Sequence, residues 1–361
     1  MSDYRKTKLY DSHQSLKAKL VPFSGFWMPL QYSSIIKEHH HVRSKCGLFD
    51  VSHMGEFIVS GNNAKTFLQN VTTNDIQNLE AGKVQYSAFC NDSGGVIDDL
   101  LVYHLGDRYM LVVNASNIEK NFEWLSSKLI DDVSLEDKSD TMSLLALQGP
   151  LSRTYLKKLY PKIEDLKYYE TLLPDNNEVI VARTGYSGEL GFEIYAPNSI
   201  ILKLWNEILS LSDDILPVGL GCRDSLRLEM GYCLYGNELN EQTTTIEAGL
   251  SWITKHETSF IGSNSMQDNL PSKKLIALIS EERAIPRSGY KIFSKDKKEV
   301  GVVTSGGMSP CLKKGIALAY VDYEMRLDKE FLIGIRDNFF IFEKTKLPFY
   351  KNGTYLKWKT S

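Results

Sequence analysis

The sequence lacks the cysteine patterns that hold a structural metal or a disulfide framework. Its five cysteines are odd in number, and no two of them stand at the short spacing that a zinc site requires. They are Cys46, Cys90, Cys222, Cys233 and Cys311. We therefore expect a reduced, cytoplasmic protein that holds no metal.

Long apolar runs and an excess of one charge are also missing. No stretch approaches the roughly 18–20 apolar residues of a membrane helix, and residues 1–6 do not begin an apolar secretory segment. The 42 basic and 45 acidic side chains give a net charge of −3, which provides no general attraction to nucleic acid. We expect neither a membrane nor a nucleic acid as a partner.

Glycine-rich motifs that cradle phosphates are absent as well. Gly219 and Gly221 are followed by Cys222 and an arginine, which is not the dinucleotide-binding pattern. Gly82-Lys83 continues into a valine strand, so it is not a P-loop. These absences argue against dinucleotide-dependent enzymes and against nucleotide hydrolases.

At roughly 150 residues per domain, the 361 residues correspond to about 2.4 domains, so we expect two or three. Three apolar runs, at 84–90, 96–104 and 109–113, are separated by glycine-containing turns and predict an antiparallel meander. From residue 274 onward the pattern consists of strands and turns, which predicts a separate C-terminal β domain. Without a regular βαβ order, we expect an α+β fold with antiparallel sheets. Helices are expected at residues 33–46, 118–129, 200–211 and 221–230, with Gly47 and Gly231 ending the first and the last.

Histidines gather in the first of these helices, as Glu38-His39-His40-His41. Consecutive helical residues point roughly 100° apart, so three adjacent histidines cannot meet at one ion, and we expect a half-exposed helix face. His53 has two equal interpretations, as a site residue or as a bridge between backbone groups after a strand.

Two adjacent carboxylates, Asp98 and Asp99, stand inside an otherwise apolar strand. Alternation along a strand sends them to opposite faces, so at least one is partly buried. Asp98 is interpreted as closing the preceding hairpin turn through local hydrogen bonds. Asp99 would then be a buried carboxylate suited to an amine or a developing cation.

A second carboxylate of interest, Glu193, follows the glycine-rich stretch 184–191. If it points inward, it can pair with a planar N–H/NH2 edge. A surface strand with Glu193 pointing outward is the alternative.

Two arginines, Arg223 and Arg227, stand one helical turn apart near the start of the last predicted helix. An internal salt bridge and an anionic ligand explain them equally well. Tyrosines stand in or beside these segments and offer stacking surfaces for a flat ring. The combination indicates a planar, polar ligand with an anionic tail. The tyrosines are Tyr86, Tyr103, Tyr168, Tyr169, Tyr186, Tyr232 and Tyr235.

Several strings, in order along nearly the whole chain, resemble the T-protein family, the aminomethyltransferases of the glycine cleavage system. The strings are GLFDVSHM at 47–54, GGVIDDL at 94–100, VVNA at 112–115, LQGP at 147–150, TGYSGE at 184–189, RDSLRLE at 223–229, LYG at 234–236 and TSG at 304–306.

The resemblance implies three domains, arranged as a cloverleaf around a central cavity that holds tetrahydrofolate. Residues 1–54 and 141–250 would form a discontinuous first domain, and residues 55–140 a second, with Asp99 on its meander. Residues 251–273 would connect these to a barrel-like third domain at 274–361.

The resemblance also implies a reaction. The lipoyl arm of an H-protein would deliver an aminomethyl group, and the products would be 5,10-methylenetetrahydrofolate, ammonia and the dihydrolipoyl H-protein. Asp99 would be catalytic, Glu193 would hold the pterin edge and Arg223 the folate carboxylates. Tyr86, Asn114, Tyr169, Tyr186 and Tyr355 would complete the folate pocket.

The sequence departs from the family pattern at Ser187, where Thr is usual, and at Leu190. Two other functions stay open on the same fold: a folate-dependent demethylase of a methylated small molecule, and a folate-binding accessory protein of iron–sulfur assembly. The latter carries a Lys-Gly-Cys string that residues 229–236 lack. A basic cluster near the C-terminus fits either an acidic partner or a solvated tail. It consists of Lys344, Lys346, Lys351, Lys357 and Lys359.

Overall fold

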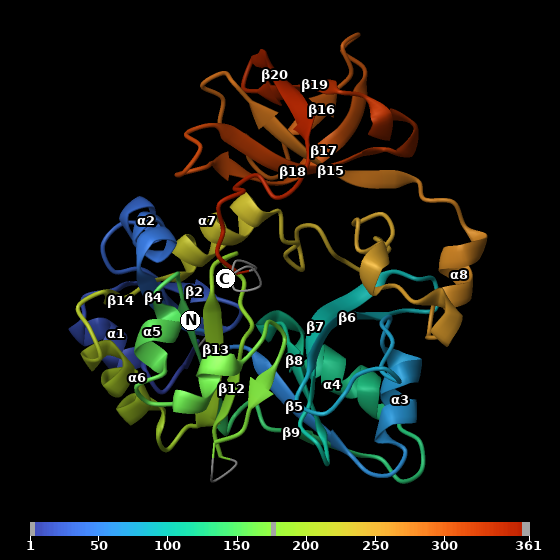
Figure 1. Ribbon diagram of the computed structural model, residues 1–361. Coiled ribbons are helices and arrows are strands. Elements are labelled where there is room, and N and C mark those ends of the chain that lie inside the picture. Colours follow the sequence, from blue (N-terminus) through green and yellow to red (C-terminus); the bar gives the residue numbers. More distant parts are fainter. Residues whose placement is uncertain (1–3, 175–177, 356–361) are drawn as a thin grey trace.

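The computed structural model describes residues 4–174 and 178–355, so Lys357 and Lys359 lie outside the described residues. Three sheet-bearing parts surround the centre of the molecule, with the C-terminal barrel on one side and two mixed α/β parts opposite it (Figure 1). The antiparallel sheets, the helices and the closed barrel confirm the predicted α+β fold. In the described part of the chain, no helix is long and apolar enough to cross a bilayer.

The first part is built on a six-stranded sheet that is buried on both faces. Alternate residues enter two separate cores: Leu147 and Ile194 pack with Trp205 on one face, whereas Ala146 and Tyr195 pack on the other. All neighbouring strands are antiparallel except β14 and β4. The strand order is β11 (Thr171–Leu172), β12 (Ile180–Ala182), β13 (Gly191–Pro197), β10 (Met142–Gln148), β4 (Cys46–Asp50) and β14 (Ile215–Pro217).

Helices and a small sheet complete this part. The small sheet has the order β1 (Arg5–Lys6), β3 (Phe26–Gln31) and β2 (Lys19–Phe23). The helices are α1 (Tyr10–Ser15), α2 (Ile35–Ser44), α5 (Ser152–Leu156), α6 (Ile201–Ser210) and α7 (Leu220–Met230).

The second part is a five-stranded antiparallel sheet that contains the predicted meander. Its order is β6 (Val84–Cys90), β7 (Val96–His104), β8 (Tyr109–Val113), β5 (Gly55–Ser60) and β9 (Ser134–Asp137), and α3 (Ala64–Val71) and α4 (Ile118–Ser126) accompany it. The turn before β7 needs its two glycines. Gly94 has φ +86°, and a Cβ on Gly95 would lie 1.9 Å from the Glu241 carbonyl oxygen. Residues 240–244 therefore pass directly against the start of the strand that carries Asp99.

The third part is a closed six-stranded barrel, as predicted for the C-terminal region. Its strand order is β15 (Lys273–Ser280), β18 (Gly315–Asp322), β17 (Glu299–Met308), β16 (Lys291–Phe293), β19 (Glu330–Ile335) and β20 (Asn338–Thr345). The barrel has its own apolar core, centred on Leu278, Phe331 and Phe342. A short helix, α8 (Ser263–Asp268), lies in the segment that leads to it (Figure 1).

Of the two helix ends predicted at glycines, one is confirmed and the other is wrong. Gly231 ends α7 in the left-handed region, at φ +72°, as expected. Gly47 does not end α2, because the helix stops at Ser44 and Gly47 lies inside β4. A Cβ at Gly47 would lie 2.5 Å from Val218, so close packing rather than a helix end requires glycine there.

The six-stranded sheet takes β4 from before residue 54 and its other strands from after residue 141, whereas the five-stranded sheet lies within residues 55–137. The boundaries of the three domains stay a prediction.

Candidate functional site

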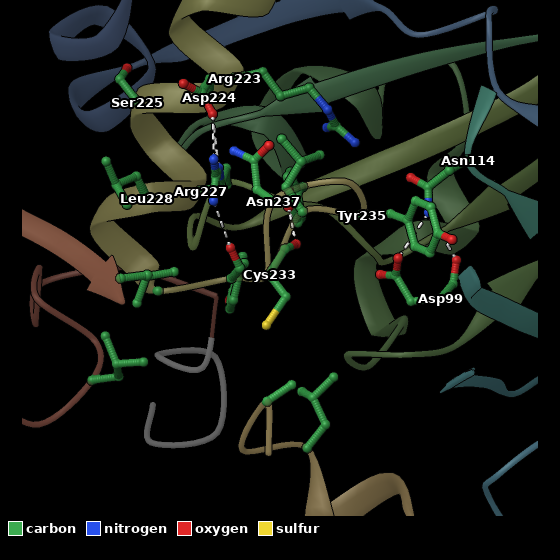
Figure 2. Close-up of a pocket in the computed structure, with 18 of the residues that line it drawn as sticks. Asp99, Asn114, Arg223, Asp224, Ser225, Arg227, Leu228, Cys233, Tyr235 and Asn237 are labelled. Carbon is green, nitrogen blue, oxygen red and sulfur yellow. Dashed lines mark hydrogen bonds and ion pairs between the residues drawn. The ribbon is translucent and has the colours of Figure 1, made fainter. Parts of the chain in front are cut away.

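A cavity of about 1930 Å³ lies where the three parts meet. The central segment that follows α7 contributes Tyr235 and Asn237 to its lining (Figure 2). Its lining includes all eight residues predicted for the site. They are Tyr86, Asp99, Asn114, Tyr169, Tyr186, Glu193, Arg223 and Tyr355.

Asp99 is held on β7 by two donors. The Tyr86 hydroxyl donates to Oδ2 at 2.8 Å. Asn114 Nδ2 donates to Oδ1 at 2.9 Å (Figure 2). Burial raises the pKa of Asp99 above its ordinary value, against the effect of these hydrogen bonds. The carboxylate is thus fixed in place at the cavity wall, and it is more basic than an exposed aspartate.

Asp98 is fully buried on the opposite face of β7. Its carboxylate accepts side-chain hydrogen bonds from Asn114 (2.8 Å), Asn117 (2.7 Å) and Asn121 (2.6 Å). The interpretation of Asp98 as a local hairpin-turn residue was therefore wrong, since these partners stand 16 to 23 residues away. Burial and the neighbouring Asp99 raise the pKa of Asp98 to about 7. One amide group, Asn114 Nδ2, connects the two carboxylates.

Glu193 points inward from β13 and is only 5% exposed, which excludes the surface-strand alternative. Thr184 Oγ1 donates to Oε2 at 2.5 Å, and the Tyr103 hydroxyl lies 3.5 Å from the same oxygen. Among the described residues, none donates to Oε1. One carboxylate oxygen is thus held by the protein while the other is open to a ligand.

The two arginines of α7 have different roles. Arg227 pairs with Asp224 at 2.8 Å and with Glu238 at 3.1 Å, so the salt-bridge explanation applies to it. Arg223 has its guanidinium 4.8 Å from the centre of the Tyr186 ring, and within residues 4–174 and 178–355 no carboxylate lies at ion-pair distance. Figure 2 shows the Arg223 side chain reaching away from the Arg227 cluster. Arg223 is therefore the arginine that a ligand can use.

Tyrosines line the cavity in two groups. The rings of Tyr186 and Tyr232 stack at 5.7 Å and 27°. Tyr168 contacts both Tyr169 (4.6 Å) and Tyr355 (5.6 Å) edge-on. Burial raises the pKa of Tyr169 and Tyr186, so both stay neutral phenols. These rings provide flat apolar surfaces close to Glu193.

Trp252 was missed by the sequence analysis. It lines the cavity while 58% exposed, and its ring lies 5.8 Å from that of Tyr86, the tyrosine bonded to Asp99. Residues 251–273 were treated as a connecting segment. The signal available in the sequence was a single tryptophan in a largely polar stretch.

His53 lines the cavity as well, buried edge-on against Phe23 and Phe26. Burial lowers its pKa to about 4, so the imidazole is neutral. Its Nδ1 has no hydrogen-bond partner in the described part of the chain, so it does not bridge backbone groups through that atom.

The three consecutive histidines diverge as helix geometry requires. His39 is buried against Glu229 at 3.0 Å, His40 is exposed, and His41 contacts the Asp214 carbonyl oxygen. His39, Glu229 and Cys311 bring potential ligand atoms within 4.8 Å of one another, a grouping that the sequence did not predict. Arg43 donates to the same Glu229 oxygen at 2.9 Å, and this positive charge disfavours a metal ion there.

The chain matches known proteins over nearly its whole length. Residues 9–258 match the family model of the GCVT N-terminal domain, and residues 273–351 that of the glycine cleavage T-protein C-terminal barrel domain. Aminomethyltransferases of Halothermothrix orenii (45% identity) and Chloroherpeton thalassium (46%) each align over 96% of this chain and 99% of their own. The glycine cleavage system aminomethyltransferase T of Bartonella henselae superposes with a TM-score of 0.92 at 32% identity, covering 98% of this chain and 99% of its own. The chain therefore belongs to the glycine cleavage T-protein family of aminomethyltransferases.

Proposed function

We propose that the protein transfers the aminomethyl carbon from the lipoyl arm of an H-protein to tetrahydrofolate. The products are 5,10-methylenetetrahydrofolate, ammonia and the dihydrolipoyl H-protein. The observation that carries the proposal is one cavity with three features: an open Glu193 oxygen, the Arg223 guanidinium, which pairs with no carboxylate of the described residues, and an Asp99 carboxylate held by two donors. The full-length aminomethyltransferase relatives favour this activity over a demethylase or an accessory protein of iron–sulfur assembly.

Tetrahydrofolate fits the lining group by group. Glu193 Oε1 accepts from the N–H/NH2 edge of the pterin, while Thr184 keeps the other oxygen in place. Tyr169 and Tyr186 cover the ring, Tyr355 closes the same aromatic wall, and Arg223 meets a carboxylate of the tail. The cavity exceeds the roughly 300–1,000 Å³ of ordinary ligand pockets, which leaves room for the lipoyl arm beside the folate.

The reaction needs proximity and charge stabilisation rather than a covalent enzyme intermediate. The carbon–sulfur bond of the N–CH2–S unit breaks, the electron pair leaves with the thiolate, and an iminium remains. A folate nitrogen attacks this carbon, and the second folate nitrogen displaces ammonia as the methylene bridge closes. The two folate nitrogens release two protons in total: one leaves with the amino group as ammonia, and the other protonates the thiolate.

Asp99 acts both as the thiolate leaves and as the folate nitrogen attacks. Its carboxylate stabilises the positive charge that develops as the thiolate leaves. Its raised pKa makes it a better acceptor for the proton of the attacking nitrogen. Tyr86 and Asn114 keep both oxygens in place, so little reorganisation is needed during the reaction.

The proposal is tested by mixing the protein with aminomethyl-loaded H-protein, with and without tetrahydrofolate. We expect ammonia and methylenetetrahydrofolate to appear in equal amounts and only when folate is present. Folate binding without ammonia release would show that the donor is wrong, and methylated small molecules would then be tested as donors.

A further inference from the structure

The two adjacent carboxylates of β7 are joined by a single amide group. Asn114 Nδ2 donates to Asp98 Oδ1 at 2.8 Å, to Asp99 Oδ1 at 2.9 Å and to the Asp99 carbonyl oxygen at 3.1 Å. Asn114 comes directly after β8, the neighbour of β7 in the sheet. An amide nitrogen has two hydrogens, so these three acceptors share them. Whatever fixes this amide therefore also fixes the Asp99 carboxylate.

Asp98 holds Asn114 at two points. Its Oδ1 accepts from the side-chain amide, and its Oδ2 accepts from the Asn114 backbone N–H at 3.1 Å. Asn117 Nδ2 donates to Oδ1 at 2.7 Å and Asn121 Nδ2 to Oδ2 at 2.6 Å. Asp98 is fully buried and is not part of the cavity lining. It can therefore influence a ligand only through its neighbours.

Neutral donors alone surround the Asp98 carboxylate in the described part of the chain. Lys120, next to Asn121 on α4, donates instead to the Tyr235 hydroxyl at 2.8 Å and to Glu241 at 3.3 Å. All four groups bonded to Asp98 are N–H donors, so this arrangement requires the ionised carboxylate. Hydrogen bonds to a charged acceptor are roughly twice as strong as neutral ones, so the Asn114 amide is firmly held.

The orientation of the Asn114 amide decides what it offers to the cavity. Figure 2 shows its nitrogen turned towards Asp99. None of the described residues donates to the amide oxygen, Oδ1, and Asn114 lines the cavity. A flipped amide would place an oxygen against two carboxylates and would remove a donor from both. In the observed orientation, Oδ1 is free to accept from a ligand N–H.

We propose that Asp98 is a positioning residue for the transfer reaction. It fixes the Asn114 amide, which in turn holds the Asp99 carboxylate and presents an acceptor to an N–H group of the substrate. The inference rests on the proposed function and adds a residue that contacts neither the folate nor the lipoyl arm. One carboxylate of the adjacent pair then faces the reacting groups, and the other orients the amide that holds it.

The test is a double-mutant cycle between Asp98 and Asn114. The rate is that of a single turnover of aminomethyl-loaded H-protein at saturating tetrahydrofolate. The pH is 8, above the pKa of Asp98, which burial and the charge of Asp99 raise to about 7. Asp98→Asn lacks the charge and cannot accept from all four donors, so we expect the rate to fall by about 10- to 100-fold. The dissociation constant for tetrahydrofolate should change by less than about fivefold, because Glu193 and Arg223 are untouched.

Non-additivity identifies the route of the effect. Asn114→Ala should also slow the reaction, and adding Asp98→Asn to it should have no further effect. Rates are compared per folded protein, with folding followed by circular dichroism. Asp98→Ser, which is smaller and leaves room for a water molecule, replaces Asp98→Asn in the cycle if the latter does not fold, with the same expectation.

Thr72→Ala is the matched control for loss of stability. Thr72 is fully buried, donates through Oγ1 to the Leu68 carbonyl oxygen at 2.8 Å and does not line the cavity. Its substitution removes a buried hydrogen bond from the same part of the molecule, so the unfolding free energy should decrease while the rate stays within twofold.

The outcomes separate this inference from the proposed function. Additive effects of Asp98→Asn and Asn114→Ala would overturn the inference, since Asp98 would then not act through the amide. A rate loss in Asp98→Asn no larger than that in Thr72→Ala would also overturn it, by leaving Asp98 a role in folding alone. Both results leave the proposed function intact. Absence of ammonia release from the unmodified protein would overturn the proposed function, and this inference with it.

Discussion

The substitution Asp99→Asn removes one negative charge from the reacting centre and leaves its shape. Asparagine is nearly isosteric, its Oδ1 can still accept a hydrogen bond, and its amide can donate to the Tyr86 hydroxyl. The fold and the affinity for tetrahydrofolate should therefore change little, within a few-fold.

The effect on the rate follows from the lost attraction. Two unit charges roughly 4 Å apart interact by about 4 kcal/mol at an effective dielectric constant of about 20. If this attraction is present only as the iminium forms, its loss slows the chemical step by about 1,000-fold. Burial raises the pKa of Asp99, so the carboxylate is also the better proton acceptor, and its loss acts in the same direction.

The assay is a single turnover of aminomethyl-loaded H-protein at saturating tetrahydrofolate, with ammonia and methylenetetrahydrofolate measured together. Calorimetry measures the folate affinity of the same preparation. Asp107→Asn serves as the control, because this aspartate is on the same sheet in an exposed turn, 77% exposed, and outside the cavity lining. A turnover rate of Asp99→Asn within fivefold of the unmodified protein would refute the electrostatic role.

Three further substitutions test binding and stability. Glu193→Ala should weaken tetrahydrofolate binding by about 10- to 100-fold, since a charge-assisted hydrogen bond contributes about 1.5–3 kcal/mol, and an unchanged dissociation constant in calorimetry would contradict the assignment. Both carboxyl oxygens of Glu56 are buried without a partner among the described residues, and burial holds its pKa well above the usual value of 4.5. The folded state therefore keeps a proton that the unfolded state releases, so the unfolding free energy falls as the pH rises above about 4.5. Glu56→Gln should remove this contribution to the pH dependence of the unfolding free energy, measured by urea titrations between pH 5 and 8. Although burial opposes it, the bond to His39 and the charge of Arg43 lower the pKa of Glu229 to about 2. The ionised Glu229 carboxylate therefore contributes fully to the unfolding free energy above about pH 4.5, and this contribution is lost as the pH falls towards 2. Glu229→Gln should lower the unfolding free energy by about 3–5 kcal/mol at pH 7, measured by the same titrations. A decrease below about 1 kcal/mol would show that the interaction of Glu229 with His39 and Arg43 contributes little to stability.

Several local elements were predictable because their signals lie within a few residues. The meander at 84–113 has alternating apolar runs and glycine turns, and the structure has strands at the expected positions. Helix α7 ends at Gly231 because a left-handed residue is needed there. The start of α4 at Ile118 agrees with the predicted range 118–129, whereas the helix ends at Ser126, before the predicted end.

The eight candidate site residues came from the family resemblance and from unusual polar residues within apolar strands. Their positions span residues 86 to 355, and the structure brings all of them to one cavity. Their individual roles stay predictions until the substitutions are measured.

The sequence by itself determined the fold class, the meander, the C-terminal β region and the polar residues that packing would not choose. Only the tertiary structure decided what surrounds these residues. Asp98 accepts hydrogen bonds from asparagines that stand 16 to 23 residues away. Arg227 forms an ion pair with Glu238, whereas Arg223 on the same helix pairs with no carboxylate among the described residues. His39 met Glu229 and Cys311 from distant segments. Local periodicity reports which face of an element a side chain occupies, but hydrogen-bond partners and charge neutralisation depend on which other elements pack against that face.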